Sequence, residues 1–254
     1  MLPLAALAPH KSGLRGVFCD IDDTLTHDGV LVPEAFAALT RAKAAGLRVV
    51  PVTGRPAGWA AVIAATWPVD AAIGENGAIY FTREARVFWD SDEARALCRS
   101  RLDKIAADVL THVPRARLAN DQWLRLCDLA FDIGEFQTLE PDEVADICAR
   151  IEAGGARSTI STVHAHAILG SWDKAQMSRR VAHDLFHEEL DATREHYLFV
   201  GDSPNDQAAF AYFPVSAGVS NVTRYLDRLA PPPAFVATRP GGHGFAEILD
   251  AILS

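Results

Sequence analysis

A short apolar stretch that ends in carboxylates constrains this chain more than any other feature. Val17 to Ile21 has the length of a buried strand in a parallel sheet and is too brief for a helix. Asp20 and Asp22 fall at its carboxyl end, and residues two apart share a face of an extended backbone. Carboxylates this close repel one another by about 1 kcal/mol per pair at 4 Å in water, and by more when partly buried. The stretch therefore predicts a bound divalent metal; the alternative is an acidic turn whose Asp and Thr residues cap a helix.

The chain that follows alternates between strands and helices. Residues 33–45 and 57–67 have helical character, whereas 47–52 and 69–73 are apolar strands. A β-α-β-α-β order predicts an α/β fold with a doubly wound parallel sheet and right-handed crossovers. The alternation resumes near the end of the chain, where we expect strands at 197–200, 215–219 and 235–237 and helices at 174–186, 205–211, 222–229 and 245–253.

The middle of the chain departs from this alternation. After a hairpin with arms at 78–81 and 86–89, we expect helices at 95–110 and 142–153 and strands at 124–133 and 158–169. We therefore predict a discontinuous core of residues 1–82 and 172–254 and an inserted α+β domain of residues 83–171. Hinges are expected near 81–84 and 170–173. Residues 2–8 are apolar but short, and we expect a loosely attached leader rather than a signal peptide.

The overall composition narrows the class of partner. A net charge of −9 argues against nucleic acid and anionic membranes, which favour a basic surface. The four cysteines show no metal-binding spacing, which favours free thiols in a reducing, cytoplasmic setting. No stretch approaches the roughly 18 apolar residues of a membrane span. We expect a monomer or homodimer that binds a small phosphorylated molecule with a few cations and a metal.

Three further polar sites lie, like Asp20 and Asp22, at the end of a predicted strand or the start of a helix. Thr53-Gly54-Arg55 closes the second strand, where a hydroxyl and backbone N–H groups can approach an anion. Lys174 begins a helix and could neutralise a phosphoryl oxygen, and Gly201 to Asp206 closes a later strand with more carboxylates. Each also has a structural explanation: a strand–helix turn, a solvated lysine, and a helix start with Ser203 as cap and Pro204 in the first turn. Their common placement at the carboxyl ends of strands indicates a single site.

With these four sites the chain resembles the haloacid dehalogenase (HAD) superfamily of phosphohydrolases. The resemblance is carried by Asp20, Asp22 and Thr24 in a DxDxT pattern, by T-G-R at Thr53, by Lys174, and by G-D-S-x-N-D at Gly201 to Asp206. The chain is similar to the type IIB branch, whose enzymes carry an α+β cap at the position of the insertion. The Gly-Glu-Asn-Gly-Ala turn at Gly74 also resembles that branch. The resemblance implies a Rossmann-like α/β core with a C2B cap.

The resemblance also implies roles for individual residues. Asp20 would attack the phosphorus, and Asp22 would protonate the leaving group and then activate water. Thr53 and Lys174 would hold the phosphoryl oxygens. The implied ligands of Mg²⁺ are Asp20, the backbone carbonyl of Asp22, and Asp202, with Asp206 in support. The implied substrate-binding residues are Thr24, Gly54, Arg55, Asn76 and Asn205, of which Asn205 would also orient Lys174.

The inserted domain is expected to set specificity. His166 lies in a strand that runs toward Lys174, and we expect it to contact the substrate. The alternative is a partly exposed strand histidine, which we favour for His164 on the same face. Trp172 either stacks on a sugar or covers the hinge.

These observations favour a Mg²⁺-dependent phosphatase that hydrolyses a small phosphorylated metabolite, such as a sugar phosphate, through an aspartyl-phosphate intermediate. One alternative is a phosphosugar mutase of the same branch, which would pass the phosphoryl group to another sugar hydroxyl. The other is a non-catalytic phosphoacceptor or binding module, which would need Asp20 but not Asp22.

Overall fold

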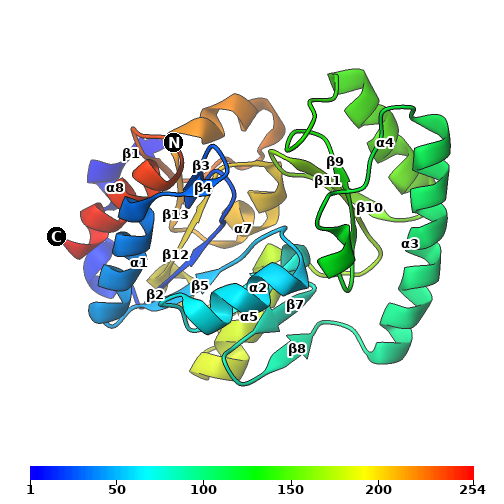
Figure 1. The fold of residues 1–254 in the computed structure, drawn as a ribbon. Helices are drawn as coiled ribbons and strands as arrows, with labels where there is room; N and C mark the ends of the chain where they lie inside the picture. The colour runs from blue at the N-terminus through cyan, green and yellow to red at the C-terminus, as the bar shows by residue number, and fades with distance from the viewer.

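The computed structural model describes residues 1–254 and contains a main sheet of six parallel strands (Figure 1). Their order across the sheet is β1 (Leu2–Pro3), β14 (Phe235–Val236), β13 (Ser216–Gly218), β12 (Tyr197–Gly201), β2 (Gly16–Cys19) and β5 (Arg48–Pro51). The predicted strand at Val17 is therefore an interior strand, with β12 and the edge strand β5 as its neighbours. Because both neighbours are parallel to β2, the carboxyl ends of all three strands lie at one edge of the sheet.

Helices cover both faces of this sheet, which confirms the doubly wound α/β prediction. Alternate residues of β2 point to opposite faces, so Val17 and Phe18 belong to different apolar clusters. The cluster on one face includes residues of α1 (Pro33–Ala44) and α8 (Gly241–Leu253), which pack on each other (Figure 1). The cluster on the other face includes residues of α5 (Lys174–Phe186) and α7 (Gln207–Tyr212).

The predicted strand at 69–73 does not become a full member of the main sheet. The strand there is β6 (Ala72–Gly74), and it forms a separate antiparallel sheet with β7 (Ile79–Phe81) and β8 (Arg86–Phe88). Its link to the main sheet is a single parallel bridge between Val52 and Ile73. The physical reason is the turn after β6, where left-handed backbone from Glu75 to Gly77 reverses the chain at once and pairs β6 with β7. Helix α2 (Ala57–Thr66) packs over β6 and β7.

A second unit with its own apolar cluster lies beside the core. It consists of α3 (Asp92–His112), α4 (Pro141–Ala153) and a sheet in the order β10 (Arg157–Ile160), β11 (His164–Ile168) and β9 (Leu129–Asp132) (Figure 1). We refer to these elements and their loops as the cap. Ala165 and Ala167 of β11 pack with α3 and α4, so His164 and His166 lie on the opposite face, as the alternation predicts. The exact boundaries, 83–171, stay a prediction.

Two strand predictions in the cap are wrong in extent. The stretch 158–169 is not one strand but the antiparallel pair β10 and β11, because the chain turns back at residues 161–163. The strand predicted at 124–133 begins only at Leu129, since Gln122–Leu124 is a 3₁₀ turn.

The N-terminal segment is attached to the core, which corrects the expectation of a loose leader. Strand β1 pairs with β14, and the Leu7 side chain is fully buried in the core cluster beneath α8. The remaining elements are short: β3 (Thr26–His27), β4 (Val30–Leu31) and α6 (Leu190–Thr193), and 3₁₀ helices at Leu4–Leu7, Lys11–Gly13, Glu75–Gly77, Gln122–Leu124, Arg194–His196, Pro204–Asp206 and Ser220–Arg228. The last of these replaces the α-helix predicted at 222–229. None of the helices combines the length and the apolar character that crossing a membrane requires.

Candidate active site

Three carboxylates from two neighbouring strand ends converge at the edge of the main sheet. Asp20 follows β2, Asp202 follows β12, and Asp206 ends the 3₁₀ turn at Pro204–Asp206. All three side chains are buried, and one carboxylate oxygen from each lies within 4.8 Å of the others. Hard oxygen donors at this spacing are typical of a Mg²⁺ site. The structure therefore brings together the acidic residues that the sequence placed at these strand ends.

Lys174 supplies the positive charge of this cluster. Its side chain is fully buried, and Nζ donates to Asp20 Oδ1 at 2.5 Å and to Asp206 Oδ1 at 2.7 Å. Burial alone would lower the pKa of Lys174, but the two carboxylates raise it, so the amine stays charged. Burial raises the pKa of Asp20 to about 8, opposed by Lys174 and reinforced by Asp206. With all three carboxyl groups ionised, one lysine would leave net negative charge, which a divalent cation would balance.

Hydrogen bonds fix the orientation of two carboxylates of this cluster, those of Asp206 and Asp202. Asp206 Oδ2 accepts from the backbone N–H groups of Asp202 and Ser203, at 2.9 and 3.2 Å. Asp202 accepts from Thr24 Oγ1 at 3.3 Å and from Asn221 Nδ2 at 2.8 Å. Thr24 was predicted to bind substrate; instead its fully buried hydroxyl supports Asp202. Asn221 was not predicted, although it stands three residues after β13, which is followed by Val219 and Ser220.

The Thr53-Gly54-Arg55 turn lies next to this cluster, because β5 is the neighbour of β2. Thr53 is buried, and its Oγ1 accepts from the backbone N–H of Arg55 at 2.9 Å. The carbonyl of Gly54 accepts from Arg125 Nη1, a cap residue, at 2.9 Å. A β-carbon added at Gly54 would come within 3.1 Å of Asn76 Oδ1 and 3.2 Å of His166 Nε2. A larger residue at this position would therefore require the side chains of Asn76 and His166 to shift by a few tenths of an ångström.

Asp22 pairs with Arg55 and is not one of the three clustered carboxylates. Arg55 Nε lies 2.9 and 3.0 Å from the two oxygens of Asp22, and Nη2 lies 2.8 Å from Oδ1. The other side of the guanidinium reaches the cap, where Nη1 donates to Glu135 at 2.8 Å and lies 3.4 Å from Asp121. Arg55 was predicted to face the substrate, and its nitrogens are instead largely occupied by carboxylates. Glu135 and Asp121 had no signal in the sequence.

Asn76 and Asn205 contact each other across the site. Asn205 Nδ2 donates to Asn76 Oδ1 at 3.2 Å, and Asn205 Oδ1 accepts from Ser203 Oγ at 2.9 Å. Asn76 Nδ2 is buried without a partner, so it remains free to donate to a ligand. The prediction that Asn205 orients Lys174 is wrong, because the lysine is held by Asp20 and Asp206.

His164 is buried, so the partly exposed strand histidine favoured for that position is wrong, and His166 is fully buried as well. The Nδ1 atom of His166 lies 3.0 Å from Asp128 Oδ2, and the same carboxylate group accepts from Arg125. Burial lowers the pKa of His166 to about 4, although Asp128 opposes the shift. The ring is therefore neutral, and its unpartnered Nε2 points at Gly54 of the core. His166 lies at the boundary of core and cap, packed on the predicted phosphate turn.

Glu75 joins the core to the cap. Its buried carboxylate accepts four backbone N–H groups: from Ala57 in the core at 3.0 Å and from Leu126, Cys127 and Asp128 in the cap at 2.8, 2.6 and 2.9 Å. Burial and the neighbouring Asp128 raise the pKa of Glu75 to about 7, opposed by Arg125 and by these N–H groups. Two roles were predicted for Trp172: to stack on a sugar or to cover the hinge. Its side chain is buried, and Nε1 donates to the carbonyl of Glu75 at 3.2 Å. This position favours the second role.

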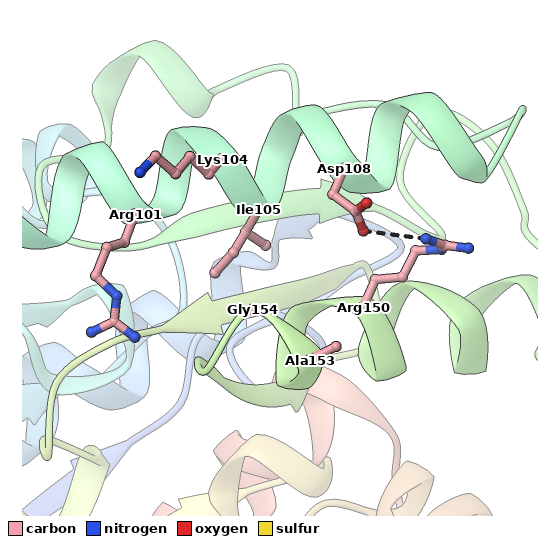
Figure 2. A pocket seen from close by; sticks show the side chains of 7 residues that line it. All are labelled: Arg101, Lys104, Ile105, Asp108, Arg150, Ala153 and Gly154. Atoms are coloured by element: carbon pink, nitrogen blue, oxygen red, sulfur yellow. Dashed lines mark hydrogen bonds and ion pairs between the residues drawn. The ribbon is translucent and has the colours of Figure 1, made fainter.

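Two hollows open between core and cap beside these residues. One, of about 330 Å³, includes Lys174, Asn205 and the cap residue Arg157 in its wall. The other, of about 350 Å³, includes Asp22, Arg55 and Glu135. A larger hollow of about 490 Å³ lies elsewhere, between α3 and α4 of the cap, where the Asp108–Arg150 ion pair crosses it (Figure 2). None of the carboxylates or the lysine described above lines that third hollow.

Comparisons with known proteins agree with this geometry. Residues 17–96 match the model of the haloacid dehalogenase-like hydrolases. A search of curated proteins finds no match. Among solved structures, a Thermoplasma acidophilum protein has a TM-score of 0.74 at 22% identity, covering 95% of this chain and 99% of that one. The sucrose-phosphatase of Synechocystis, solved with sucrose and phosphate, has a TM-score of 0.68 at 13% identity, covering 94% and 98%. A Bacteroides thetaiotaomicron protein described among phosphatases of the HAD superfamily has a TM-score of 0.61 at 18% identity, covering 95% and 96%.

Proposed function

We propose that this chain is a hydrolase of the haloacid dehalogenase superfamily and, more closely, a Mg²⁺-dependent phosphatase for a small phosphorylated metabolite. The observation that carries the proposal is the cluster at the sheet edge: Asp20 beside a fully buried lysine and two further carboxylates. Such a cluster combines a nucleophile with cationic groups that can hold a phosphoryl group.

The donor set fits Mg²⁺. Asp20, Asp202 and Asp206 offer three carboxylate oxygens within 4.8 Å, and all three residues are buried. When bound, the ion would neutralise charge on the phosphoryl oxygens and on the carboxylates that surround them. Thr24 and Asn221 hold Asp202 in the orientation that such a ligand needs.

The first chemical step uses Asp20 and Asp22. A carboxylate oxygen of Asp20 forms a bond to phosphorus while the bond from phosphorus to the leaving oxygen breaks. Asp22 donates its proton to that leaving oxygen, which departs as an alcohol. Lys174 and the Thr53 turn hold the phosphoryl oxygens during transfer, so positioning and charge contribute most of the rate enhancement.

The second step returns the enzyme to its starting state. Asp22, now a carboxylate, accepts a proton from water as the water oxygen attacks phosphorus. The bond between phosphorus and the Asp20 oxygen then breaks, and inorganic phosphate is released.

The hollow beside Asp22 supports a sugar phosphate or phosphorylated polyol as substrate. Of the 12 residues in its wall only two are hydrophobic, and the others include Thr162, Arg224 and Glu135. Such a wall suits a leaving group rich in hydroxyl groups. The likeness in fold to a sucrose-phosphatase supports the same class. All four cysteines have free thiols, which supports a reducing, cytoplasmic setting.

Phosphate release from a panel of sugar phosphates, with Mg²⁺ and with EDTA, tests the proposal. We expect Mg²⁺-dependent turnover in the wild type and loss of at least about 10³-fold in Asp20→Asn, which removes the nucleophile. Asp250→Asn, an exposed residue of α8, is the matched control and should keep wild-type activity. Turnover that survives Asp20→Asn, or substrate isomerisation without phosphate release, would contradict a phosphatase; the latter would instead identify a mutase.

A further inference from the structure

Arg55 is held on every side by groups from both core and cap. Its Nε and Nη2 pair with Asp22, its Nη1 pairs with Glu135, and the ring of Trp59 lies 5.4 Å from the guanidinium carbon. The side chain is only 10% exposed. A planar guanidinium that is bidentate on one carboxylate transmits its own orientation to that carboxylate.

Glu135 is the cap residue that fixes the free side of this guanidinium. It follows β9, and Asp132 orders its loop by accepting from the backbone N–H groups of Gly134 and Glu135. Glu135 Oε1 accepts from Arg55 at 2.8 Å, and Oε2 lies 3.1 Å from His164 Nε2. The only other carboxylate at Arg55 Nη1 is Asp121, at 3.4 Å. Glu135 is therefore the shorter and better-supported contact of the two.

A continuous chain of polar contacts thus runs from the cap to Asp22. His164 contacts Glu135, Glu135 contacts Arg55, and Arg55 contacts both oxygens of Asp22. Glu135 and Asp22 also line the same hollow, so cap and core meet at the place where a leaving group would be protonated. No residue of the cap other than Glu135 and Asp121 pairs with Arg55.

We propose that Glu135 is a positioning residue that, through Arg55, orients the carboxyl group of Asp22 toward the leaving oxygen. This role rests on the proposed phosphatase activity, in which Asp22 is the proton donor. Without the charge of Glu135, Arg55 Nη1 turns toward Asp121 and rotates Asp22 with it. Docking of the cap and alignment of the acid are therefore one event in this protein.

A comparison of substrates with different leaving groups separates this positioning role from a general structural role. An alkyl phosphate such as glycerol phosphate expels an alkoxide and needs a proton donor, whereas p-nitrophenyl phosphate expels a stable phenolate and needs little help. The value of kcat/KM reports the steps up to cleavage of the bond to the leaving oxygen, in which Asp22 acts as acid.

The experiment compares both substrates for the wild type, Glu135→Gln, Glu135→Ala and Asp121→Asn in the presence of Mg²⁺. We expect Glu135→Gln and Glu135→Ala to lower kcat/KM for the alkyl phosphate by roughly 10- to 100-fold, part of the 10²–10⁴-fold that general acid catalysis contributes. For p-nitrophenyl phosphate we expect less than about a 3-fold loss. Asp121→Asn, at the longer contact, should change the ratio between the two substrates by less than either Glu135 variant.

The possible outcomes are distinct. Equal losses on both substrates, or no loss on either, would overturn the positioning role while leaving the phosphatase activity in place. A wild type that hydrolyses neither substrate would overturn the proposed function itself. Thermal unfolding of each variant checks its fold, and Glu135→Gln, which keeps the shape of the side chain, decides the matter if Glu135→Ala unfolds.

Discussion

Burial determines what individual charged and polar side chains do in this protein. Lys174 stays charged inside the core because two carboxylates contact it, whereas His166 is neutral because burial outweighs its single carboxylate partner. The two residues come from elements that meet at the same boundary, and neither is exposed. Because both side chains are buried, the difference in their charge states follows from the number of carboxylate partners that oppose the effect of burial.

The neutral state of His166 predicts a pH-dependent contribution to stability. Its folded-state pKa is lowered from 6.5 to about 4, so the unfolded chain binds a proton below pH 6.5 that the folded chain does not bind. The contribution is fully present above pH 6.5 and is lost as the pH falls through about 4. The unfolding free energy, measured by urea titration, should fall between pH 7.5 and 4.5 in both proteins. We expect the fall in His166→Gln to be smaller than in the wild type by about 2–3 kcal/mol. Parallel pH curves for wild type and His166→Gln would show that His166 is protonated alike in the folded and unfolded chains.

At the scale of elements, the turn between β6 and β7 determines the geometry of the site. Glu75, Asn76 and Gly77 all have positive φ, and this turn places Asn76 opposite Asn205 and Glu75 beneath the cap. Gly77 lies against Asp173, the residue that caps α5 through the backbone N–H of Gln176. Because Lys174 is the first residue of α5, the turn also determines where Lys174 lies.

Substitution of Gly77 tests this dependence. Gly77 has φ of +112°, and an added β-carbon would come within 2.3 Å of the Asp173 carbonyl oxygen. We expect Gly77→Ala to lower the unfolding free energy by about 3 kcal/mol or more, since backbone strain and overpacking add. Gly46→Ala shares the positive φ, at +84°, but meets open space, and should cost only about 1–2 kcal/mol. Equal costs in urea unfolding would mean that Asp173 moves freely and that contact with Gly77 does not position α5.

At the scale of the whole molecule, the buried carboxylate of Glu75 makes the largest set of hydrogen bonds between the cap and the core. Glu75 uses both oxygens to accept N–H groups, three of them from consecutive cap residues, and Trp172 donates to its backbone carbonyl. The cap also reaches the core through Arg125 at Gly54 and Glu135 at Arg55. In this structure the cap is a docked wall of the active site, joined to it by buried polar contacts.

Replacing Glu75 by glutamine should loosen this attachment. Gln offers one acceptor oxygen, so its amide N–H₂ would face two of the four backbone donors and leave them unpaired. At about 1–3 kcal/mol for each unsatisfied group, we expect Glu75→Gln to cost about 2–5 kcal/mol in urea unfolding. Hydrogen exchange at residues 126–128 should become faster, whereas Glu84→Gln, in the exposed turn after β7, should leave it unchanged. Unchanged exchange in Glu75→Gln would show that other contacts hold the cap.

The convergence of the central residues of the site could be predicted from the sequence alone. Asp20 and Asp202 end apolar strands and Lys174 begins a helix, and in a doubly wound parallel sheet strand ends and helix starts share one edge. Local pattern and this topological rule together were enough to predict their convergence. The same reasoning predicted that His164 and His166 share a face, because alternation along a strand is also a local property.

How the cap meets the core depends on tertiary packing. The pairs of Glu75 with Cys127, Arg55 with Glu135 and Gly54 with Arg125 join residues 52 to 80 positions apart, and no periodicity relates their positions. Each pair depends on how two separately formed sheets pack, and that packing is set by shape and burial summed over many residues. For the same reason Leu7, which looked like part of a loose leader, lies in the core: its burial depends on the space left beside a strand more than 200 residues away.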